Sequence, residues 1–373
     1  MALFSMLLFA VLAAASFSDT RVPPFCGNPF PLVSKNLDFF EGLANGSINA
    51  EQGSSDILSV QNYGGPREWP RNSENKVVIE YCFDTPVSRN NIGASFRDFG
   101  VGEWMSALGG AASKTTGHGL VIEETVDANG MPLFCLDLYN GKWNQKLDYN
   151  TVVVQWFDIR NFAGSASIGF VGFTSGGPPE PGIHRMKFGH SWINPTLVHE
   201  LGHVLGMTHE HQRKDRDNSV AYRCHNVEDF QKKFEQLQSE ISDATWSDLC
   251  DNIVNGVKVG FSGRDFVRGY SAGDPRTRQG QTLQWEVADH GEPYDHKSIM
   301  QYPSDVLMAN DVVCLPRMTD GCTLVNNAKG HEKQYLYIPF HPSEADIKWV
   351  KKTYPWMDSP KAAEIGAANG TAS

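Results

Sequence analysis

One stretch constrains this chain more than any other: TLVHELGHVLGMTHEHQR, from Thr196 to Arg213, which holds four of the 12 histidines. Asn194 suits an N-cap and Pro195 suits the first helical position, so a helix is predicted to begin there. His199 and His203 are four residues apart, which places both imidazoles on one face of that helix. Two imidazoles in this arrangement can bind one metal ion.

The residues around these histidines add a catalytic group and a third ligand. Glu200 follows the first histidine and points sideways, so it reaches a water on the metal rather than the metal itself. This is the HExxH pattern of two ligands plus a general base. Gly206 permits a sharp turn, after which His209 returns as a further ligand. Three neutral imidazoles leave a coordination position open, as catalytic zinc sites do. We therefore predict one Zn²⁺ per chain on His199, His203 and His209.

Two stretches carry a resemblance to a known family. HExxHxxGxxH resembles the pattern of metzincin metalloproteases, and its continuation HEHQRKDRD is similar to the astacin family. In PYDHKSIMQYP, Met300 resembles the methionine that lies beneath the zinc in that family. Tyr302 occupies the position of an additional zinc ligand. The resemblance spans about residues 60–356. Another metzincin subfamily is the alternative, and both SIMQY and the glutamate after the third histidine speak against it.

The resemblance implies a zinc endopeptidase that acts on proteins or peptides. Zinc would lower the pKa of its water toward about 7, and Glu200 would take the proton and pass it to the leaving nitrogen. Tyr302 would leave the metal and hydrogen-bond the oxyanion, which makes it both ligand and catalytic residue. The alternative is a catalytically silent protein-binding module on a metzincin scaffold. Such a module needs neither Glu200 nor Tyr302.

Three neighbouring residues have other expected roles. In astacins the glutamate after the third histidine engages the freed N-terminus of the mature enzyme, and Glu210 holds that position here. His211 and His296 lie near the motifs but match no ligand position. We expect these two histidines to be exposed or to lie behind the ligands.

The hydrophobic patterns predict an α+β fold. Strands are predicted at 76–83, 120–125, 151–157 and 183–188, and helices at 89–108 after Ser88, at 227–241, and from Ser343 to Thr353. The resemblance implies an N-terminal lobe with a twisted mixed sheet, an irregular C-terminal lobe and an active-site cleft between them. It also suggests that the strand at 183–188 pairs with the substrate backbone as a sheet edge.

The N-terminal sequence indicates export. Residues 1–18 have the length and composition of a signal peptide and are short for a membrane span, although a short anchor is the alternative. Residues 19–61 are rich in Pro, Asn, Gly and Ser and are predicted to be a pro-segment. The catalytic domain is predicted at 62–356 and a disordered tail at 357–373. We expect a secreted, extracellular monomer with no membrane attachment after signal removal.

Charge excludes one class of partner. The formal net charge is -11 and there is no run of basic residues, which argues against nucleic-acid binding. Arg213, Lys214 and Arg216 alternate with Asp215 and Asp217. This alternation predicts a solvated loop whose charges pair with one another.

The seven cysteines of an exported chain predict disulfides with one cysteine left over. Cys224 with Cys250 and Cys314 with Cys322 are plausible local pairs, although six cysteines allow 15 pairings. The six do not match the two usual astacin disulfides. No partner for the remaining cysteines follows from the sequence.

The pro-segment carries two further features. PFCGNPF, around Cys26, resembles the matrixin segment in which a thiolate caps the zinc of a latent zymogen. A disulfide or an unpaired thiol at Cys26 is the alternative. Asn45 in this segment, and Asn369 in the predicted tail, lie in N-glycosylation acceptor triplets.

Overall fold

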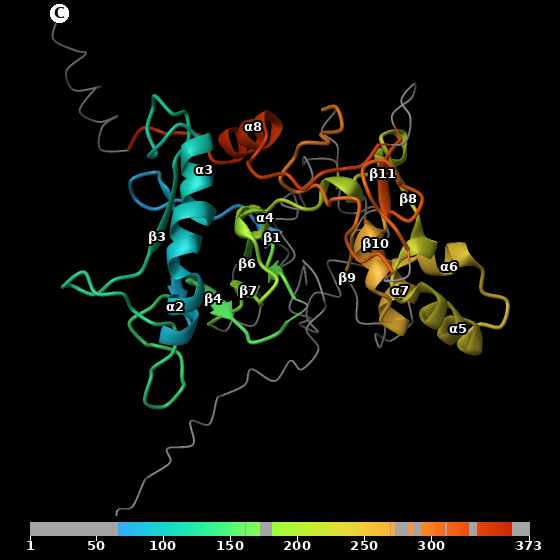
Figure 1. Cartoon of the computed structure of the whole chain (residues 1–373). Helices are drawn as coiled ribbons and strands as arrows, with labels where there is room; N and C mark the ends of the chain where they lie inside the picture. Colours follow the sequence, from blue (N-terminus) through green and yellow to red (C-terminus); the bar gives the residue numbers. More distant parts are fainter. Residues whose placement is uncertain are drawn as a thin grey trace, which may run out of the picture.

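The computed structural model describes residues 66–160, 162–171, 181–268, 270–272, 283–285, 292–309, 312–327 and 334–359. The predicted signal peptide and pro-segment, Cys26, the two glycosylation triplets and the tail beyond residue 359 lie outside these ranges. Within them, no helix is long and apolar enough to cross a membrane. The described chain forms two halves with the helix α4 between them (Figure 1).

A five-stranded sheet organises the N-terminal half. Its strands, in spatial order, are β3 (Leu120–Glu124), β2 (Val77–Phe83), β4 (Val152–Trp156), β7 (Arg185–Phe188) and β5 (Gly164–Ala166). The first four are parallel and β5 is antiparallel to β7. The valines of β4 are all buried, as a continuous apolar run predicts for a strand covered on both faces. A short antiparallel pair, β1 (Pro66–Arg67) with β6 (Phe170–Val171), lies outside this sheet.

The strand at the edge of this sheet is β5, not β7. β7 pairs with β4 on one side and β5 on the other, so the prediction that the strand at 183–188 offers a free edge is wrong. Ser167 N donates to Arg185 O, and Gly189 N donates to Ala163 O. The backbone groups of Ala163 and Ser167 thus face β7, and because this direction alternates along an antiparallel strand, those of Gly164, next to Ala163, point away from β7. The sequence GSA is too short and too poor in β-branched residues to have indicated a strand.

A long helical segment covers the sheet. It comprises α2 (Pro86–Ser95), the π-helix η1 (Phe96–Val101) and α3 (Gly102–Ala107). Thr85, rather than the predicted Ser88, is the N-cap, because its side chain accepts a hydrogen bond from Ser88 N and Pro86 takes a first-turn position. The helix therefore begins three residues earlier than predicted. Trp104 fixes it to α4 by donating from Nε1 to Val198 O at 2.9 Å.

The C-terminal half contains several short helices and two small sheets. The helices are α5 (Phe230–Glu240), α6 (Trp246–Cys250) and α7 (Ile253–Val259), with 3-10 turns η3 (Arg216–Asn218), η4 (Cys224–Asn226) and η5 (Ser262–Phe266). β8 (Val220–Tyr222) pairs with β11 (Leu324–Asn326), and β9 (Tyr270–Ala272) with β10 (Leu283–Trp285). Only α5 was predicted among these three helices.

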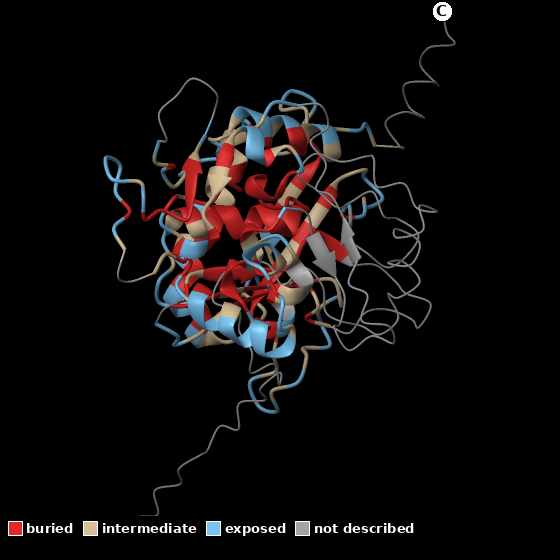
Figure 2. Cartoon of the chain, turned by 90° about the vertical axis from the view of Figure 1, so that its right-hand side faces the viewer, coloured by how far each residue is buried: buried red, intermediate tan, exposed pale blue. Residues whose placement is uncertain are grey.

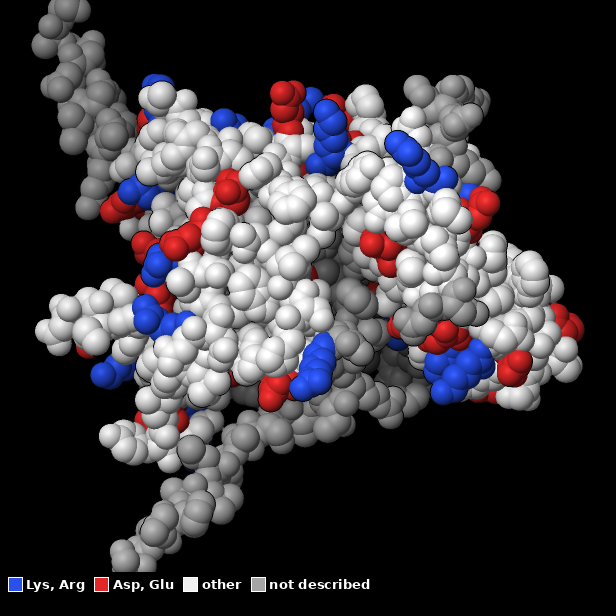
Figure 3. Space-filling model, in the orientation of Figure 1, with Lys and Arg blue, Asp and Glu red and all other residues white. Residues whose placement is uncertain are grey.

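The last helix, α8 (Glu344–Thr353), returns to the N-terminal half. Ser343 is its N-cap and forms a capping box with Asp346, which confirms the predicted start. The whole is the α+β class that the sequence predicts. The surface is hollowed between the two halves, and basic and acidic side chains are interspersed on the face shown in Figure 3.

Each half has its own hydrophobic core. Buried residues lie in the interior of the molecule and exposed ones at its periphery (Figure 2). The first core gathers side chains of the sheet, of α2–α3, of α4 and of α8, and it also contains Met300. The second contains Phe230, Phe261, Leu324 and Tyr302. Each fully buried side chain of this size contributes roughly 1.5–3 kcal/mol through apolar burial. The segment from Met300 to Tyr302 thus belongs to both cores.

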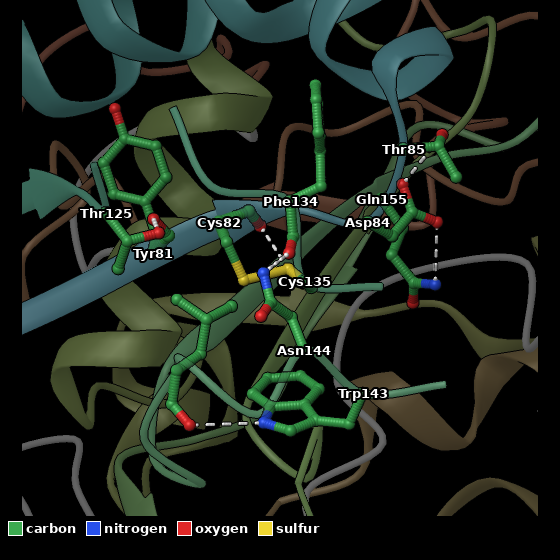
Figure 4. The surroundings of a disulfide bond; sticks show 11 residues. Tyr81, Cys82, Asp84, Thr85, Thr125, Phe134, Cys135, Trp143, Asn144 and Gln155 are labelled. Carbon is green, nitrogen blue, oxygen red and sulfur yellow. Dashed lines mark hydrogen bonds between the residues drawn. A yellow bond between two sulfur atoms is a disulfide. The ribbon is translucent and has the colours of Figure 1, made fainter. Parts of the chain in front are cut away.

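Three disulfides link the described cysteines: Cys82–Cys135, Cys224–Cys250 and Cys314–Cys322. The last two confirm the predicted local pairs. The first joins β2 to the loop that follows β3 (Figure 4). Cys135 N donates to Phe83 O at 2.9 Å, and Asn144 Nδ2 donates to Phe134 O at 3.0 Å, so backbone bonds secure the loop beside the disulfide.

Candidate active site

The helix α4 (Asn194–Leu205) carries the centre of the site. Ile193 is its N-cap, one residue before the predicted cap, and Pro195 lies in the first turn. Every residue from Leu197 to Leu205 is buried. Gly206 ends the helix with φ of 112°, a left-handed conformation that favours glycine. The predicted sharp turn is therefore present.

The structure brings the three predicted histidine ligands together. One nitrogen from each of His199, His203 and His209 lies within 4.8 Å of the other two, and all three side chains are buried. The Nε2 atoms of His203 and His209 are 3.1 Å apart. Within the described part of the chain, Nε2 of His199 has no hydrogen-bond partner. Three imidazole nitrogens that converge in this way are the donor set that zinc prefers.

Hydrogen bonds on the other ring nitrogen orient each imidazole. Nδ1 of His199 lies 2.7 Å from Ile299 O, and Nδ1 of His203 lies 2.8 Å from Met207 O. Nδ1 of His209 lies 3.0 Å from Oε1 of Gln212. An oxygen acceptor at Nδ1 favours the tautomer with its proton there, which leaves the Nε2 lone pair free for a metal.

Burial keeps these imidazoles neutral. Desolvation lowers the pKa of His199 to about 4. It also lowers the pKa of His203 and of His209 well below the usual value, and repulsion between the neighbouring histidines adds to this shift. Because metal binding needs unprotonated imidazoles, the residues present fit a zinc ion at neutral pH.

Glu200 is fully buried beside these histidines. It lines a cavity together with His199 and Tyr302. Gly164 of the edge strand β5 packs directly against it, because a Cβ atom added there would lie 3.0 Å from Glu200 Oε1 and 2.8 Å from Thr196 Cγ2. The carboxylate is thus held between its own helix and the sheet edge.

The chain from Met300 to Tyr302 lies beneath and beside the histidines. Met300 is fully buried, and its Sδ atom would be 2.6 Å from a Cβ atom at Gly202. Met300 O accepts a hydrogen bond from Glu210 N at 3.1 Å. The ring centroid of Tyr302 is 4.4 Å from that of His209 and 5.8 Å from that of His199. The predicted site residues therefore all share one location.

The two other histidines differ in their surroundings. His211 is fully buried, with its ring centroid 4.9 Å from His209 and 4.5 Å from Tyr302. Its Nε2 atom lies 3.0 Å from Asp265 O. His211 thus lies behind the ligands, the second of its two predicted positions. His296 is half-buried.

The charged segment after His209 pairs internally, as predicted, and Lys214 and Asp217 are exposed, but its two arginines are buried rather than solvated. Arg213 and Arg216 are each 3% exposed. Arg213 donates to Asp215 and to Glu210, whose Oε1 atom is 2.9 Å from Nη1, and Arg216 donates to Asp217. Glu210 lies in the 3-10 turn η2 (Glu210–Gln212). Alternating charges indicated the pairing, whereas the burial comes from distant segments that cover the loop.

Four residues of the site were not predicted: Gly164, Gln212, Ile299 and Asp346. Asp346 accepts hydrogen bonds from Ser298 Oγ and from Ile299 N, both at 2.7 Å. The sequence shows Asp346 as a capping residue only. Distant segments create the contacts of Gly164 and Ile299, so no local pattern identifies these two. Gln212 lies only three residues after His209, but a glutamine at that spacing does not by itself indicate a partner of the imidazole.

The comparisons with known proteins agree with this site. Residues 189–249 match the family model named "Astacin", which describes a family of peptidases. The chain is 34% identical over 87 residues to "Astacin-like metalloprotease toxin 4" from Loxosceles laeta, which covers 21% of this chain and 71% of that protein. It is 43% identical over 61 residues to "Bone morphogenetic protein 1" from Xenopus laevis, 16% of this chain and only 8% of that protein.

Among solved structures, high choriolytic enzyme 1, a hatching enzyme zinc-protease from Oryzias latipes, has a TM-score of 0.42 and 14% sequence identity. That match covers 81% of this chain and 96% of the other. The site and the sequence matches define a protein of the α+β class in which one helix and the turn after it supply three histidines that could hold a metal ion. The chain belongs to the astacin family of peptidases.

Proposed function

We propose that this protein is a secreted, zinc-dependent endopeptidase that hydrolyses peptide bonds in proteins or peptides. The observation that carries this proposal is the convergence of three buried, neutral imidazoles, one of which, His199, lines a cavity together with the buried carboxylate of Glu200. Membership of a peptidase family supports it.

His199, His203 and His209 would hold the zinc ion, with Tyr302 as an additional ligand. Bound zinc supplies Lewis acidity, which acidifies water and polarises a carbonyl oxygen. The chain's own contribution is preorganisation: hydrogen bonds to the oxygens of Ile299, Met207 and the Gln212 side chain fix the three rings before any metal arrives.

Glu200 would act as the general base. It follows His199 on α4 and lines the same cavity, which supports a role in taking a proton from the attacking water and giving it to the leaving nitrogen. Packing against Gly164 restricts the carboxylate to few positions. Tyr302 would donate a hydrogen bond to the oxyanion that forms on the substrate.

The edge strand β5 would position the substrate backbone. Gly164 lines the cavity, and its peptide groups point away from β7. An extended peptide can therefore add to the sheet at β5 and pass the metal site.

Export and latency belong to the same proposal. Three disulfides in the described chain favour an oxidising compartment, as the apolar segment at residues 1–18 does. We propose a monomer that is released from a zymogen, with Cys26 as a candidate zinc cap. The alternative, a protein-binding module without turnover, is not favoured, because a carboxylate packed this closely beside the metal site has no use in binding alone.

The test compares wild type with Glu200→Ala in cleavage of casein and in zinc content. We expect one zinc ion in each protein and cleavage by wild type only. Glu235→Ala, which removes an exposed glutamate on α5, is the control and should cleave like wild type. Cleavage by Glu200→Ala at the wild-type rate would show that another group is the base. If no variant cleaves, removal of residues 19–61 separates latency from a binding module.

A further inference from the structure

The cavity beside Glu200 has a volume of about 150 Å³ and an apolar wall. Aliphatic side chains from three separate segments form this wall: Ile193, Pro195, Pro303, Val306, Ile338 and Pro339. They come from the start of α4, from the segment after Met300, and from the segment before α8. His199, Glu200 and Tyr302 line the same space. A side chain that enters this cavity is therefore next to the reacting bond.

The charges around the cavity disfavour an acidic occupant. Among the described residues that line it, none is Lys or Arg, and Glu200 is the acidic one. A second carboxylate would meet no Lys or Arg side chain among these described residues, would lie beside the carboxylate of Glu200, and would exchange its water for an aliphatic wall, which is costly for a charged group. An uncharged side chain meets neither cost.

The N-terminus of α4 also faces the cavity, and helix N-termini attract anions. This end of α4 has few free donors, however. Pro195 has no N–H, and Thr196 N donates to Ile193 O at 2.8 Å. Ile193 N in turn donates to Thr196 Oγ1 at 3.3 Å. The attraction that this helix end offers to a carboxylate is correspondingly weak.

The size of the cavity suits a large apolar side chain. An engineered apolar cavity of roughly 150 Å³ in another protein takes up benzene. The present cavity can thus hold a branched aliphatic or phenyl group, and each buried methylene favours such a group over alanine.

We infer that this cavity is a specificity pocket for a large, uncharged apolar side chain on a residue that flanks the scissile bond, and that it rejects Asp and Glu. This inference rests on the proposed peptidase function. Ile338, which is half-buried in the wall, is the position at which a charge would change the preference most directly.

The test digests a peptide library with the secreted, zinc-loaded protein and identifies the cleaved bonds by mass spectrometry. We expect bonds with Leu, Ile, Met or Phe at one flanking position to be cleaved at least tenfold faster than bonds with Ala there. Hydrophobic pockets discriminate by roughly 10–200-fold per methylene group. Bonds with Asp or Glu at that position should be cleaved more slowly than bonds with Ala. Enrichment of acidic residues, or no preference at either flanking position, would overturn the inference.

Three variants sharpen the test. Ile338→Arg should increase cleavage beside Asp and Glu relative to Leu at least tenfold. Ile338→Gln, similar in length but uncharged, should weaken the preference for Leu without admitting acidic residues. Ile159→Arg changes an exposed isoleucine outside the cavity and should leave the preference unaltered. Equal behaviour of Ile338→Arg and Ile159→Arg would contradict the assignment of the pocket.

A binding measurement separates failure of this inference from failure of the proposed function. Fluorescein-labelled alanine hexapeptides with a single Leu or a single Asp are titrated into the zinc-loaded wild-type protein, which retains Glu200. If no library peptide is cleaved by wild type, either with or without residues 19–61, the endopeptidase proposal fails. At least tenfold tighter binding of the Leu peptide would still support the pocket, and equal or tighter binding of the Asp peptide would refute it.

Discussion

The Nδ1 atom of His199 lies 2.7 Å from the backbone oxygen of Ile299, a residue one hundred positions further along the chain. The amide nitrogen of the same Ile299 donates to Asp346 at 2.7 Å. One residue therefore links His199, a candidate metal ligand on α4, to the first turn of α8. Because these bonds set the orientation of an imidazole, we expect Asp346 to affect the candidate metal site without touching it.

Replacing Asp346 should weaken zinc binding. We expect Asp346→Ala to lower zinc affinity about tenfold, the lower end of the range for groups that orient metal ligands, as measured by competition with a chelator. Ser343→Ala is the matched control, since it removes the cap of α8 but no hydrogen bond to Ser298 or Ile299. Equal losses in the two variants would assign the effect to the helix cap instead.

Adding one methyl group at Gly164 should impair catalysis more than metal binding. In Gly164→Ala the new Cβ would lie 3.0 Å from Glu200 Oε1, so the carboxylate must shift. We expect kcat to fall at least tenfold, a change typical of a displaced general base, with zinc content unchanged. Ser165→Ala, on the opposite face of β5, is the control. Unchanged kcat in Gly164→Ala would show that the close packing has no role.

Crowding Met300 should destabilise the fold. Gly202→Ala places a Cβ atom 2.6 Å from the Met300 sulfur in a fully buried site. We expect the free energy of unfolding to fall by about 1–3 kcal/mol, as overpacking generally costs, in urea denaturation. Shortening the neighbour in Gly202→Ala/Met300→Ala should cost less than the sum of the two single changes. Strict additivity would rule out the proposed clash.

Acid should destabilise the N-terminal half through His184. This histidine is fully buried between Trp69 and Phe170, and desolvation lowers its pKa to about 3 from 6.5. The unfolded chain therefore takes up a proton below pH 6.5 that the folded chain does not, so stability falls as pH decreases from 6.5 toward 3. The slope is at most about 1.4 kcal/mol per pH unit.

Substitution isolates this contribution. Relative to His184→Phe, wild type should lose unfolding free energy as the pH decreases from about 6.5 to about 4.5. Urea denaturation at both values measures it. A difference that does not change with pH would mean that His184 is protonated in the folded protein.

The sequence predicted those parts of the site that local spacing determines. His199 and His203 share a helix face by periodicity, Gly206 marks the turn, and Ser343 with Asp346 marks the start of α8. The structure places all of these as expected. Tyr302 came from the family resemblance rather than from any physical pattern.

The remaining features depend on contacts between distant segments. Gly164 meets Glu200 because the sheet order places β5 beside α4, and no spacing in the sequence reports that order. Arg213 and Arg216 have the composition of a surface loop, yet other segments bury them. The edge strand was assigned to 183–188 for the same reason: the sequence shows strand propensity but not which neighbours a strand will have.

Met300 belongs to the core of one half and Tyr302, two residues later, to the core of the other. A hinge between the halves would have to pass through this short segment, and any rotation there would pull apart the very groups that surround the metal site. We therefore expect a cleft of constant width. An enzyme with such a cleft selects its substrates by the shape and charge of a preformed, rigid surface, and not by closing around them.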